Sequence, residues 1–406
     1  MGFREVKIMA GAELIGKEEL KEIKVLFETG IFARYSLDRE RQGIWKVRDF
    51  EHAFAQYFGS QYALGVSSGS CALKIALTAL DVGPGDEVIC PAFTFMATYE
   101  AVLEVGAIPV MADIDDTLNL DPDDIPNKLT PRTKAIIPVH MCGAPARMDK
   151  ILKVAKKHKL LVLEDNAQAC GASIRGKMTG TFGQMGIFSF DHYKTITTGE
   201  GGMIITDDMD LYHRAEWYHD HGHDHLSTVS RALDGRTILG FNYRMNEIQG
   251  GIGLAQLRKL NRVLAAQRKN KAAIEAMLAP IPGLKFRAVP DPEGDSATHL
   301  GFNLPTAGKA KAFQKALKAE GIDTVCFKDN FWHYVPNWEH FLAKSTAQTK
   351  SPFTDPRNRK VKYSRKTIPR AEDLLGRTLI MGVSVKMPAA KIRAIQRGIT
   401  KSAQVL

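Results

Sequence analysis

The sequence is poor in cysteine. Its 406 residues include only five cysteines, which are scattered, odd in number and free of CxxC spacing. Disulfide-stabilised domains and cysteine-based zinc sites need pairs of cysteines at short, regular spacing. The pattern therefore excludes both and is typical of reduced, packed residues in a cytoplasmic protein. The five residues are Cys71, Cys90, Cys142, Cys170 and Cys326.

Long hydrophobic runs are also missing. No apolar stretch reaches the roughly 20 residues that a membrane-spanning helix requires. The first fourteen residues, MGFREVKIMAGAEL, lack the apolar central region of a secretory signal peptide. We therefore expect a cytoplasmic location and no membrane partner.

Acidic residues are outnumbered by basic ones. There are 55 lysines and arginines against 45 aspartates and glutamates, which gives a formal net charge of +10. Such a balance raises the possibility of nucleic-acid binding, but no RNP, helix-turn-helix or zinc-finger pattern accompanies it. It also suits a phosphorylated cofactor and an acidic substrate. We expect these small anions, and no nucleic acid, to be the ligands.

Apolar runs alternate with amphipathic segments along the first two thirds of the chain. This alternation predicts a mainly parallel sheet with both faces covered by helices, and ligand groups at the carboxyl ends of its strands. We expect strands within residues 61–70, 83–91, 108–114, 135–143, 160–165 and 201–206. We expect helices at residues 17–29, 49–59, 71–80, 97–107, 149–159 and 248–277.

The length suits a large domain followed by a smaller one. We expect a large domain over residues 1–275 and a small C-terminal α/β domain over residues 276–406. Strand and helix signals resume at residues 299–305 and 309–321. The segment 345–370 is polar, basic and short of apolar periodicity, which predicts a long surface loop.

Lys194 is the most informative residue of the chain. It lies in SFDHYKTITTGEGG, residues 189–202, among glycine, serine and threonine. A lysine in such a setting can form a Schiff base with the aldehyde of pyridoxal 5'-phosphate (PLP). Asp165 ends the apolar run 160–165, so a buried strand would deliver its carboxylate to the pyridine nitrogen of that cofactor. The alternative, a surface lysine and a strand-end cap, does not explain the two features together.

Further residues suit other parts of the same cofactor. Gly69 and Ser70 stand where a strand and turn lead into a helix, whose free N–H groups bind a phosphate. Ser189 can add a hydroxyl to that site, and Gln168 can donate to the phenolic oxygen. Phe95, in a segment that follows a strand, can lie flat on the ring. A simple helix cap and core packing remain open as alternatives for the glycine turn and for Phe95.

Two segments are rich in histidine. Residues 218–225 read YHDHGHDH, with four histidines in alternation. A metal site is less favoured there than a solvated or substrate-facing loop, and we predict no metal. Residues 331–341 read FWHYVPNWEHF, which either lines a sugar pocket or packs the small domain.

Several of these stretches occur together, and in the same order, in one known family. The chain resembles the DegT/DnrJ/EryC1/StrS family of PLP-dependent sugar aminotransferases from about residue 19 to 260. The resemblance is carried by SSGSCAL, GPGDEVICPAFTFMAT, GAIPVMADID, AIIPVHMCG, EDNAQACGA, GTFGQMGIFSF, KTITTGEGGMIITDD and GFNYRMNEIQGGIGLAQL. It implies the PLP fold type I architecture of aspartate aminotransferase.

The resemblance also implies roles for individual residues. Lys194 would be the Schiff-base lysine and the proton carrier, Asp165 would pair with the pyridinium nitrogen, and Gln168 would contact the phenolic oxygen. Asn242 would reach the phosphate of the neighbouring subunit's cofactor, which implies a homodimer with shared active sites. Gly69, Ser70 and Ser189 would contact the phosphate, and Ser70 stands in place of the family's commoner threonine. Phe95 would stack on the cofactor ring.

One position separates activities within the family. Its sugar 3-dehydratases have histidine where its aminotransferases have lysine. This chain has Lys194 there, which disfavours dehydration, and His192, two residues earlier, does not take over that role.

The substrate is predicted from finer similarities. The stretches PVHMCGAP, DHYKTITTGEGG, YHDHGHD and WHYVPNWEH resemble the branch that makes 8-amino-3,8-dideoxy-D-manno-octulosonate, an amino analogue of the lipopolysaccharide sugar Kdo. We therefore expect glutamate as amino donor and an acidic 8-oxo-3-deoxy-octulosonate as acceptor, with His219, His223 and His333 contacting the sugar. A nucleotide-linked 3- or 4-keto sugar is the alternative acceptor. A non-catalytic PLP-binding regulatory protein is an alternative of another class, disfavoured by the combination of catalytic and cofactor-binding residues.

Overall fold

The computed structural model describes residues 10–225, 232–347, 349–358 and 361–406. Within these residues, seven strands form the central sheet in the order β1-β9-β8-β5-β4-β2-β3. Neighbours from β8 to β3 are parallel, whereas β9 runs antiparallel to both β8 and β1. The strands are β1 (Tyr62–Val66), β2 (Glu87–Pro91), β3 (Ile108–Ala112), β4 (Thr133–Ile136), β5 (Leu161–Asp165), β8 (Met185–Ser189) and β9 (Gly202–Thr206).

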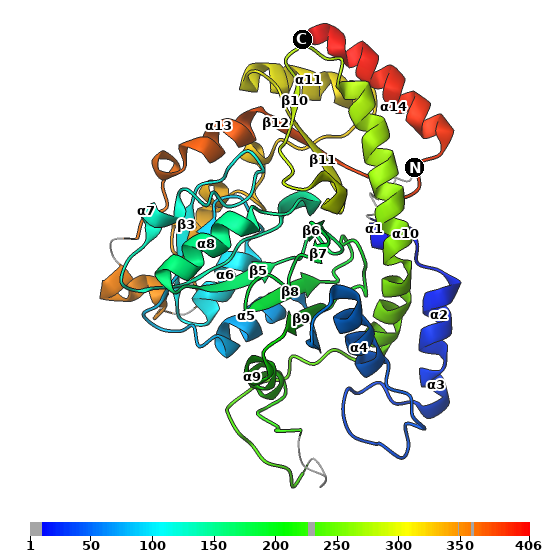
Figure 1. Cartoon of the computed structure of the whole chain (residues 1–406), viewed down its shortest axis with the longest axis vertical. Coiled ribbons are helices and arrows are strands. Elements are labelled where there is room, and N and C mark those ends of the chain that lie inside the picture. Colours follow the sequence, from blue (N-terminus) through cyan, green and yellow to red (C-terminus); the bar gives the residue numbers. More distant parts are fainter. Residues whose placement is uncertain (1–9, 226–231, 348, 359–360) are drawn as a thin grey trace.

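The sheet is buried on both faces because its strands carry apolar residues at successive positions. Successive side chains of a strand point to opposite faces. Ile204 accordingly belongs to one hydrophobic cluster, and its neighbours Met203 and Ile205 belong to another. This double burial confirms the expectation of helices on both faces (Figure 1).

The helices of the large region begin and end close to the predicted positions. They are α1 (Ala10–Glu13), α2 (Lys17–Lys24), α3 (Leu26–Thr29), α4 (Lys46–Phe58), α5 (Gly69–Ala79), α6 (Ala97–Glu104), α7 (Ile125–Lys128), α8 (Met148–His158), α9 (Met209–His219) and α10 (Glu247–Leu278). A short hairpin, β6 (Ser173–Ile174) and β7 (Lys177–Met178), stands apart from the central sheet. Strand β8 and helices α1, α7 and α9 are additions to the expected pattern, and the predicted helix at residues 17–29 is divided into α2 and α3.

A second, smaller region has a core of its own. Among the described residues, β10 (Lys285–Phe286), β11 (His299–Asn303) and β12 (Thr378–Gly382) form an antiparallel sheet. Helices α11 (Ala307–Ala319) and α14 (Ala389–Ser402) pack on it, with α12 (Glu339–Leu342) and α13 (Pro369–Arg377) elsewhere in this region. Helix α10 runs from the large sheet to this region (Figure 1). We propose residue 275, in the last turn of α10, as the division between the two.

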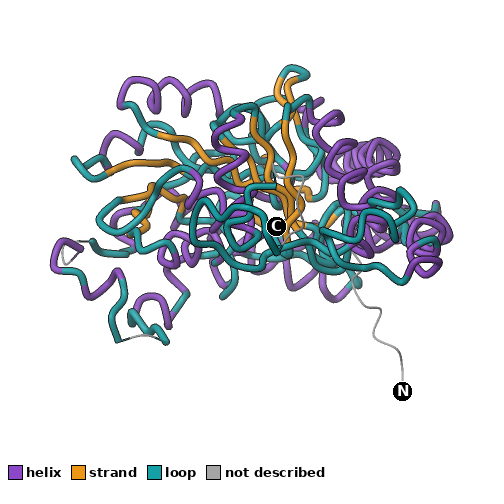
Figure 2. Tube along the Cα trace, turned by 90° about the horizontal axis from the view of Figure 1, so that it is seen from below, coloured by secondary structure: helices purple, strands orange, loops and turns teal. Residues whose placement is uncertain are grey.

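The segment 345–370 contains short 3-10 turns rather than long helices or strands over its described residues. It is nevertheless anchored: Phe353 and Ile368 are buried, and the Tyr363 hydroxyl donates to the Pro109 carbonyl oxygen at 2.8 Å. The predicted surface loop is therefore anchored by buried apolar side chains and by one hydrogen bond to β3. Figure 2 shows the strands, in orange, with helices, in purple, around them. None of the described helices, α10 included, is long and apolar enough to cross a membrane.

Candidate active site

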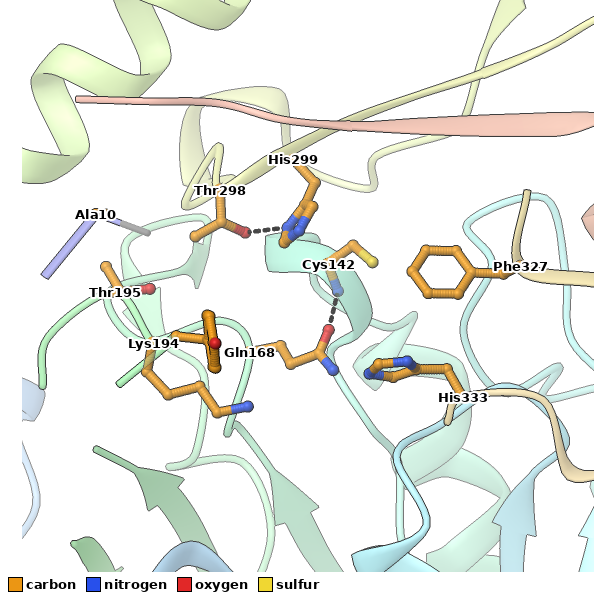
Figure 3. A pocket seen from close by; sticks show the side chains of 10 residues that line it. Ala10, Cys142, Gln168, Lys194, Thr195, Thr298, His299, Phe327 and His333 are labelled. Carbon is orange, nitrogen blue, oxygen red and sulfur yellow. Dashed lines mark hydrogen bonds between the residues drawn. The ribbon is translucent and has the colours of Figure 1, made fainter. Parts of the chain in front are cut away.

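A cavity of about 210 Å³ lies where the large sheet meets the smaller region. Its walls come from segments that follow the carboxyl ends of β4, β5 and β8, and from the start of β11 and the 327–333 segment (Figure 3). This is the edge at which parallel sheets bind their ligands. The lining residues are Ala10, Cys142, Gln168, Tyr193, Lys194, Thr195, Thr298, His299, Phe327 and His333.

Lys194 reaches the cavity from the loop between β8 and β9. Its backbone is fixed on both sides, because its N–H donates to the Asp191 carbonyl oxygen at 3.0 Å and its own carbonyl accepts from Gly11 at 3.2 Å. Burial lowers the pKa of the Lys194 amine, and the negative charges of Asp191 and Asp165 act in the opposite direction. A lowered pKa increases the fraction of neutral amine, which is the nucleophilic form.

Asp165 stands at the end of β5, where it is 4% exposed. Its Oδ2 accepts from the Thr98 hydroxyl at 2.9 Å, and its Oδ1 accepts from the Ala167 N–H at 3.1 Å. Burial raises the pKa of Asp165, and the two hydrogen bonds and the Lys194 charge lower it. The structure therefore brings the two residues singled out in the sequence into one electrostatic unit.

The neighbouring Glu164 holds the end of β5 in place. The Ala146 N–H donates to His140 Nδ1 at 3.0 Å, so this nitrogen carries no proton and Nε2 must donate to Glu164 at 3.0 Å. Glu164 also accepts the backbone N–H groups of Gly180, Phe182 and Gly183. All of these groups are inside the protein, so the pair fixes the backbone from which Asp165 projects.

The start of α5 forms a cradle against Ser189. Ser68 caps the helix by accepting from the Cys71 N–H at 3.1 Å. Gly69 and Ser70 supply the first N–H groups of the helix, which have no acceptor within it and favour an anion. A Cβ atom on Gly69 would lie 2.7 Å from the Ser189 Cβ, so only glycine allows this approach. The cradle has the N–H and hydroxyl donors that a phosphate group needs, and its three residues lie outside the described lining of the cavity.

Gln168 and Phe95 occupy different positions relative to the cavity. The Oε1 atom of Gln168 accepts from the Cys142 N–H at 3.0 Å, which leaves its NH₂ group as a donor at the cavity (Figure 3). Phe95 lies outside the set of described residues that line the cavity. It is half-buried and its ring is parallel to that of Trp332, with centroids 6.1 Å apart and an interplanar angle of 8°.

Two histidines line the cavity. Burial and the Lys194 charge lower the pKa of His333 to about 4. Burial, with the Arg287 charge, lowers the pKa of His299 to about 3. Both rings are therefore neutral at physiological pH and can both donate and accept hydrogen bonds. His299 escaped the sequence analysis because its only signal is one polar residue at the start of an apolar strand.

The other two histidines expected to contact the sugar lie elsewhere. His219 is 0% exposed, with Nε2 3.1 Å from the Tyr35 hydroxyl and Nδ1 bonded to the Glu216 carbonyl oxygen. His223 is bonded to Asp234 at 2.6 Å. Neither is among the described cavity-lining residues, and both rings already have partners in this chain. Their expected contact with a sugar is therefore not supported within one subunit. No cluster that could hold a metal occurs among the described residues.

Asn242 is exposed and lies outside the described cavity lining. Its side-chain oxygen accepts from the Arg244 N–H at 3.3 Å, and its backbone pairs with Asp220 next to α9. An exposed amide of this kind is accessible to a second molecule, as its expected role requires.

The aromatic segment 331–341 serves two purposes. Tyr334, Trp338 and Phe341 are buried in the core, whereas the His333 side chain lines the cavity. The remaining two aromatics, Phe331 and Trp332, are 64% and 59% exposed beside it. The buried aromatics belong to the core cluster of the large sheet rather than to the core of the smaller region, and the sugar-pocket interpretation stays a prediction for His333.

These groups fit PLP. The chain supplies an amine of lowered pKa, a buried carboxylate coupled to it, an amide donor, and a helix N-terminus whose first N–H groups can bind a phosphate. Residues that the sequence analysis missed complete the walls, namely Cys142, Thr298, His299 and Phe327, with Thr98 behind Asp165.

Known proteins match the chain over most of its length. The sequence profile of the DegT/DnrJ/EryC1/StrS aminotransferase family matches residues 38–399. The GDP-perosamine synthase of Caulobacter vibrioides is 46% identical over 234 residues, or 57% of this chain. The match covers 62% of that enzyme, which is less than two thirds of its length.

Two further matches extend over more of the chain. A UDP-N-acetyl-3-dehydro-alpha-D-glucosamine 3-aminotransferase of Acidithiobacillus ferrooxidans is 37% identical over 76% of this chain and 80% of its own. The solved structure of an E. coli GDP-4-keto-6-deoxy-D-mannose-3-dehydratase with bound hydrated PLP superposes with a TM-score of 0.79. It is 26% identical and covers 97% of this chain and 99% of its own.

Proposed function

The chain belongs to the DegT/DnrJ/EryC1/StrS aminotransferase family, and its cofactor is pyridoxal 5'-phosphate. We propose that it moves an amino group from an amino acid, glutamate, to a nucleotide-linked keto sugar. The observation that carries the proposal is Lys194, an amine of lowered pKa that lines the cavity and is coupled electrostatically to the buried carboxylate of Asp165. The acceptor class rests on relatives that are named for GDP-linked and UDP-linked sugars.

The cofactor would be held at four points. When bound, PLP supplies an aldehyde that bonds to an amine and a ring that withdraws electrons from the carbon next to that amine. The Lys194 Nζ atom would hold the aldehyde carbon, and the ionised Asp165 would keep a proton on the ring nitrogen. The Gln168 NH₂ group would donate to the phenolic oxygen. The phosphate would be held by Gly69 and Ser70 at the start of α5 and by Ser189 at the end of β8.

Lys194 would also act as an acid–base group. Its Nζ atom could take a proton from the donor's α-carbon and return it at another carbon, which requires an amine that is neutral before the transfer. The lowered pKa of Lys194 supplies that form. The nearby His333 and His299 are neutral and so suited to bonding sugar hydroxyls without adding charge.

The size of the cavity also suits a substrate that extends outside it. About 210 Å³ is below the range of roughly 300–1,000 Å³ in which ligand pockets usually fall. A nucleotide attached to the sugar would therefore project past the rim, where Phe331 and Trp332 expose flat aromatic surfaces beside His333. Aromatic side chains stack with bases of any sequence.

The octulosonate acceptor expected from the sequence receives less support than this alternative. The names of the relatives described above refer to GDP-linked or UDP-linked sugars. Of the three histidines offered for the octulosonate, His219 has both ring nitrogens bonded within the chain, and His223 has its Nδ1 bonded to Asp234. A role in lipopolysaccharide synthesis is part of that weaker hypothesis.

An acceptor competition tests the proposal. PLP-loaded protein is first treated with glutamate, and the loss of visible absorbance and the release of 2-oxoglutarate are measured. A regulatory protein without turnover would show neither. The treated protein is then offered a GDP- or UDP-linked keto sugar, or 8-oxo-3-deoxy-octulosonate, and the return of absorbance is followed. We expect kcat/KM to favour the nucleotide-linked sugar by about 100-fold or more. Faster reaction of the octulosonate would reverse the acceptor assignment while leaving the aminotransferase assignment intact.

We also propose that the functional unit is a homodimer in which Asn242 completes the partner's phosphate site. Lys194→Ala and Asn242→Ala proteins should each be inactive or nearly so. In a hybrid dimer one site combines both substitutions and the other has neither, so mixing should restore about a quarter of wild-type activity when subunits exchange freely.

Sedimentation of differently labelled subunits checks that hybrids have formed. Exchange without any recovery of activity would show that the sites are not shared through Asn242. A fully active monomer would contradict the dimer itself.

A further inference from the structure

We propose that Thr98 is the positioning residue for the Asp165 carboxylate and that Thr94 polarises it. The proposal rests on the role of Asp165 in the proposed function. Thr98 is the second residue of α6, and Thr94 lies in the connection between β2 and that helix. Both side chains are 0% exposed, so no water replaces the hydrogen bonds they make.

The hydrogen bonds run in one direction only. A carboxylate oxygen accepts and cannot donate, so the Thr98 hydroxyl must donate to Asp165 Oδ2 at 2.9 Å. A hydroxyl has one hydrogen, and Thr98 already donates its hydrogen to Asp165. The 2.8 Å contact between the Thr94 and Thr98 hydroxyls must therefore be donated by Thr94. Two bonds in series strengthen each other, and the second of them ends on a charge.

The arrangement fixes the carboxylate from both sides. The Ala167 N–H holds Oδ1 at 3.1 Å while Thr98 holds Oδ2, so the carboxylate cannot rotate without breaking one of these bonds. Each oxygen keeps a lone pair for a further donor, which is what a protonated ring nitrogen requires. The Thr98 bond also lowers the pKa of Asp165 against the effect of burial and so favours the ionised form.

The second threonine is itself fixed by the smaller region. The Thr94 N–H donates to the His333 carbonyl oxygen at 2.9 Å, and Phe93 pairs with Tyr334 in a short bridge. The side chain of His333 lines the cavity. A continuous series of contacts therefore leads from the cavity wall through Thr94 and Thr98 to Asp165.

The test compares isosteric and conservative substitutions of Thr98. Thr98→Val keeps the shape and removes the hydroxyl, and Thr98→Ser restores it. Each PLP-loaded protein is titrated with pH while nitrogen-15 NMR of labelled PLP reports protonation of the ring nitrogen. Loss of the donor raises the pKa of Asp165, which leaves less negative charge beside the ring. In Thr98→Val we therefore expect the ring nitrogen to lose its proton at a lower pH.

Affinity and turnover should change with the NMR signal. In Thr98→Val we expect the dissociation constant for PLP to rise about 10-fold and kcat to fall about 10-fold. This is the size expected for the loss of a hydrogen bond to a charged group. Thr98→Ser should recover both within about threefold. Thr94→Val should give a smaller shift in the same direction, because the bond to Asp165 remains but loses its polarising donor.

The matched control is Thr378→Val. Thr378 is 1% exposed, and its hydroxyl is bonded to Asn303 and to the Leu374 carbonyl oxygen in the smaller region, with no contact to Asp165. It should leave the nitrogen signal unchanged even if it lowers the melting temperature. The proposal would be overturned if the ring nitrogen of folded Thr98→Val lost its proton at the same pH as in the wild type. It would also be overturned if Thr378→Val showed the same shift as Thr98→Val.

Failure of this inference can be told from failure of the proposed function. If Asp165→Asn also leaves the nitrogen titration unchanged, Asp165 does not face the ring nitrogen and the assigned function of that residue fails. If Asp165→Asn shifts the titration and Thr98→Val does not, only the role of Thr98 is lost.

Discussion

Replacing Lys194 with alanine is expected to abolish amino transfer. The substitution removes the only group assigned both to hold the cofactor's aldehyde carbon and to carry the proton between carbons. General acid–base catalysis alone contributes about 10²–10⁴-fold, so the combined loss should be on the order of 10⁴-fold or more. The protein should still fold, because the backbone bonds of Lys194 to Asp191 and Gly11 do not involve its side chain.

Two measurements separate this result from a general loss of structure. Borohydride treatment of the PLP-loaded wild type should attach the cofactor covalently to residue 194, which mass spectrometry of peptides can locate. The Lys194→Ala protein should bind PLP reversibly through the phosphate cradle at the start of α5. Lys315→Ala, which removes an exposed lysine of α11, is the control and should behave as wild type. Full aminotransferase activity in Lys194→Ala would remove the residue from the mechanism.

Replacing Asp165 with asparagine is expected to lower kcat by about 10²-fold or more, the cost of losing a preorganised electrostatic partner. The amide has the shape of the carboxylate and can still accept from Thr98. It lacks the negative charge that keeps the ring nitrogen protonated.

The stability of this variant should change little, because two effects oppose each other. Burial raises the pKa of Asp165 in the folded protein, so the ionised carboxylate opposes folding as pH rises through the usual range of an aspartate. Asparagine removes that opposition, but with its oxygen toward Thr98 its NH₂ group faces the Ala167 N–H and that hydrogen bond is lost. The cofactor-free variant should therefore melt close to the wild-type temperature at neutral pH. A fall in kcat of less than a few-fold, with normal PLP binding, would mean that another residue faces the ring nitrogen.

Local patterns in the sequence predict every strand of the large sheet except β8, and they also point to groups at its edge. Strand β5 and the loop after β8 deliver Asp165 and Lys194 because apolar runs stop where functional residues begin. Gly69 is predictable for the same reason, since a glycine between a strand and a helix permits a close approach. Each of these signals lies within a dozen residues of the side chain that it places.

Contacts between distant segments explain what the sequence did not reveal. His219 sits in an apparently solvated motif, yet it is buried by Tyr35, which is 184 residues away along the chain. Thr98 has no motif of its own, and its partner Asp165 is 67 residues further on. The cavity wall formed by His299 and Phe327 depends on how the smaller region sits against the sheet, and no local pattern encodes that arrangement.

Helix α10 couples the stability of the two regions. Its 32 residues form an uninterrupted rod of roughly 48 Å. Leu257 and Leu260 of this helix belong to a core cluster of the large sheet, and Ile274 and Leu278 belong to the core of the smaller region. A chain cut at residue 275 would lose Leu278 and leave Ile274 without the core that covers it. The two hydrophobic cores therefore share one structural element, and melting of either exposes apolar surface that belongs to the other, so we expect the two cores to unfold together.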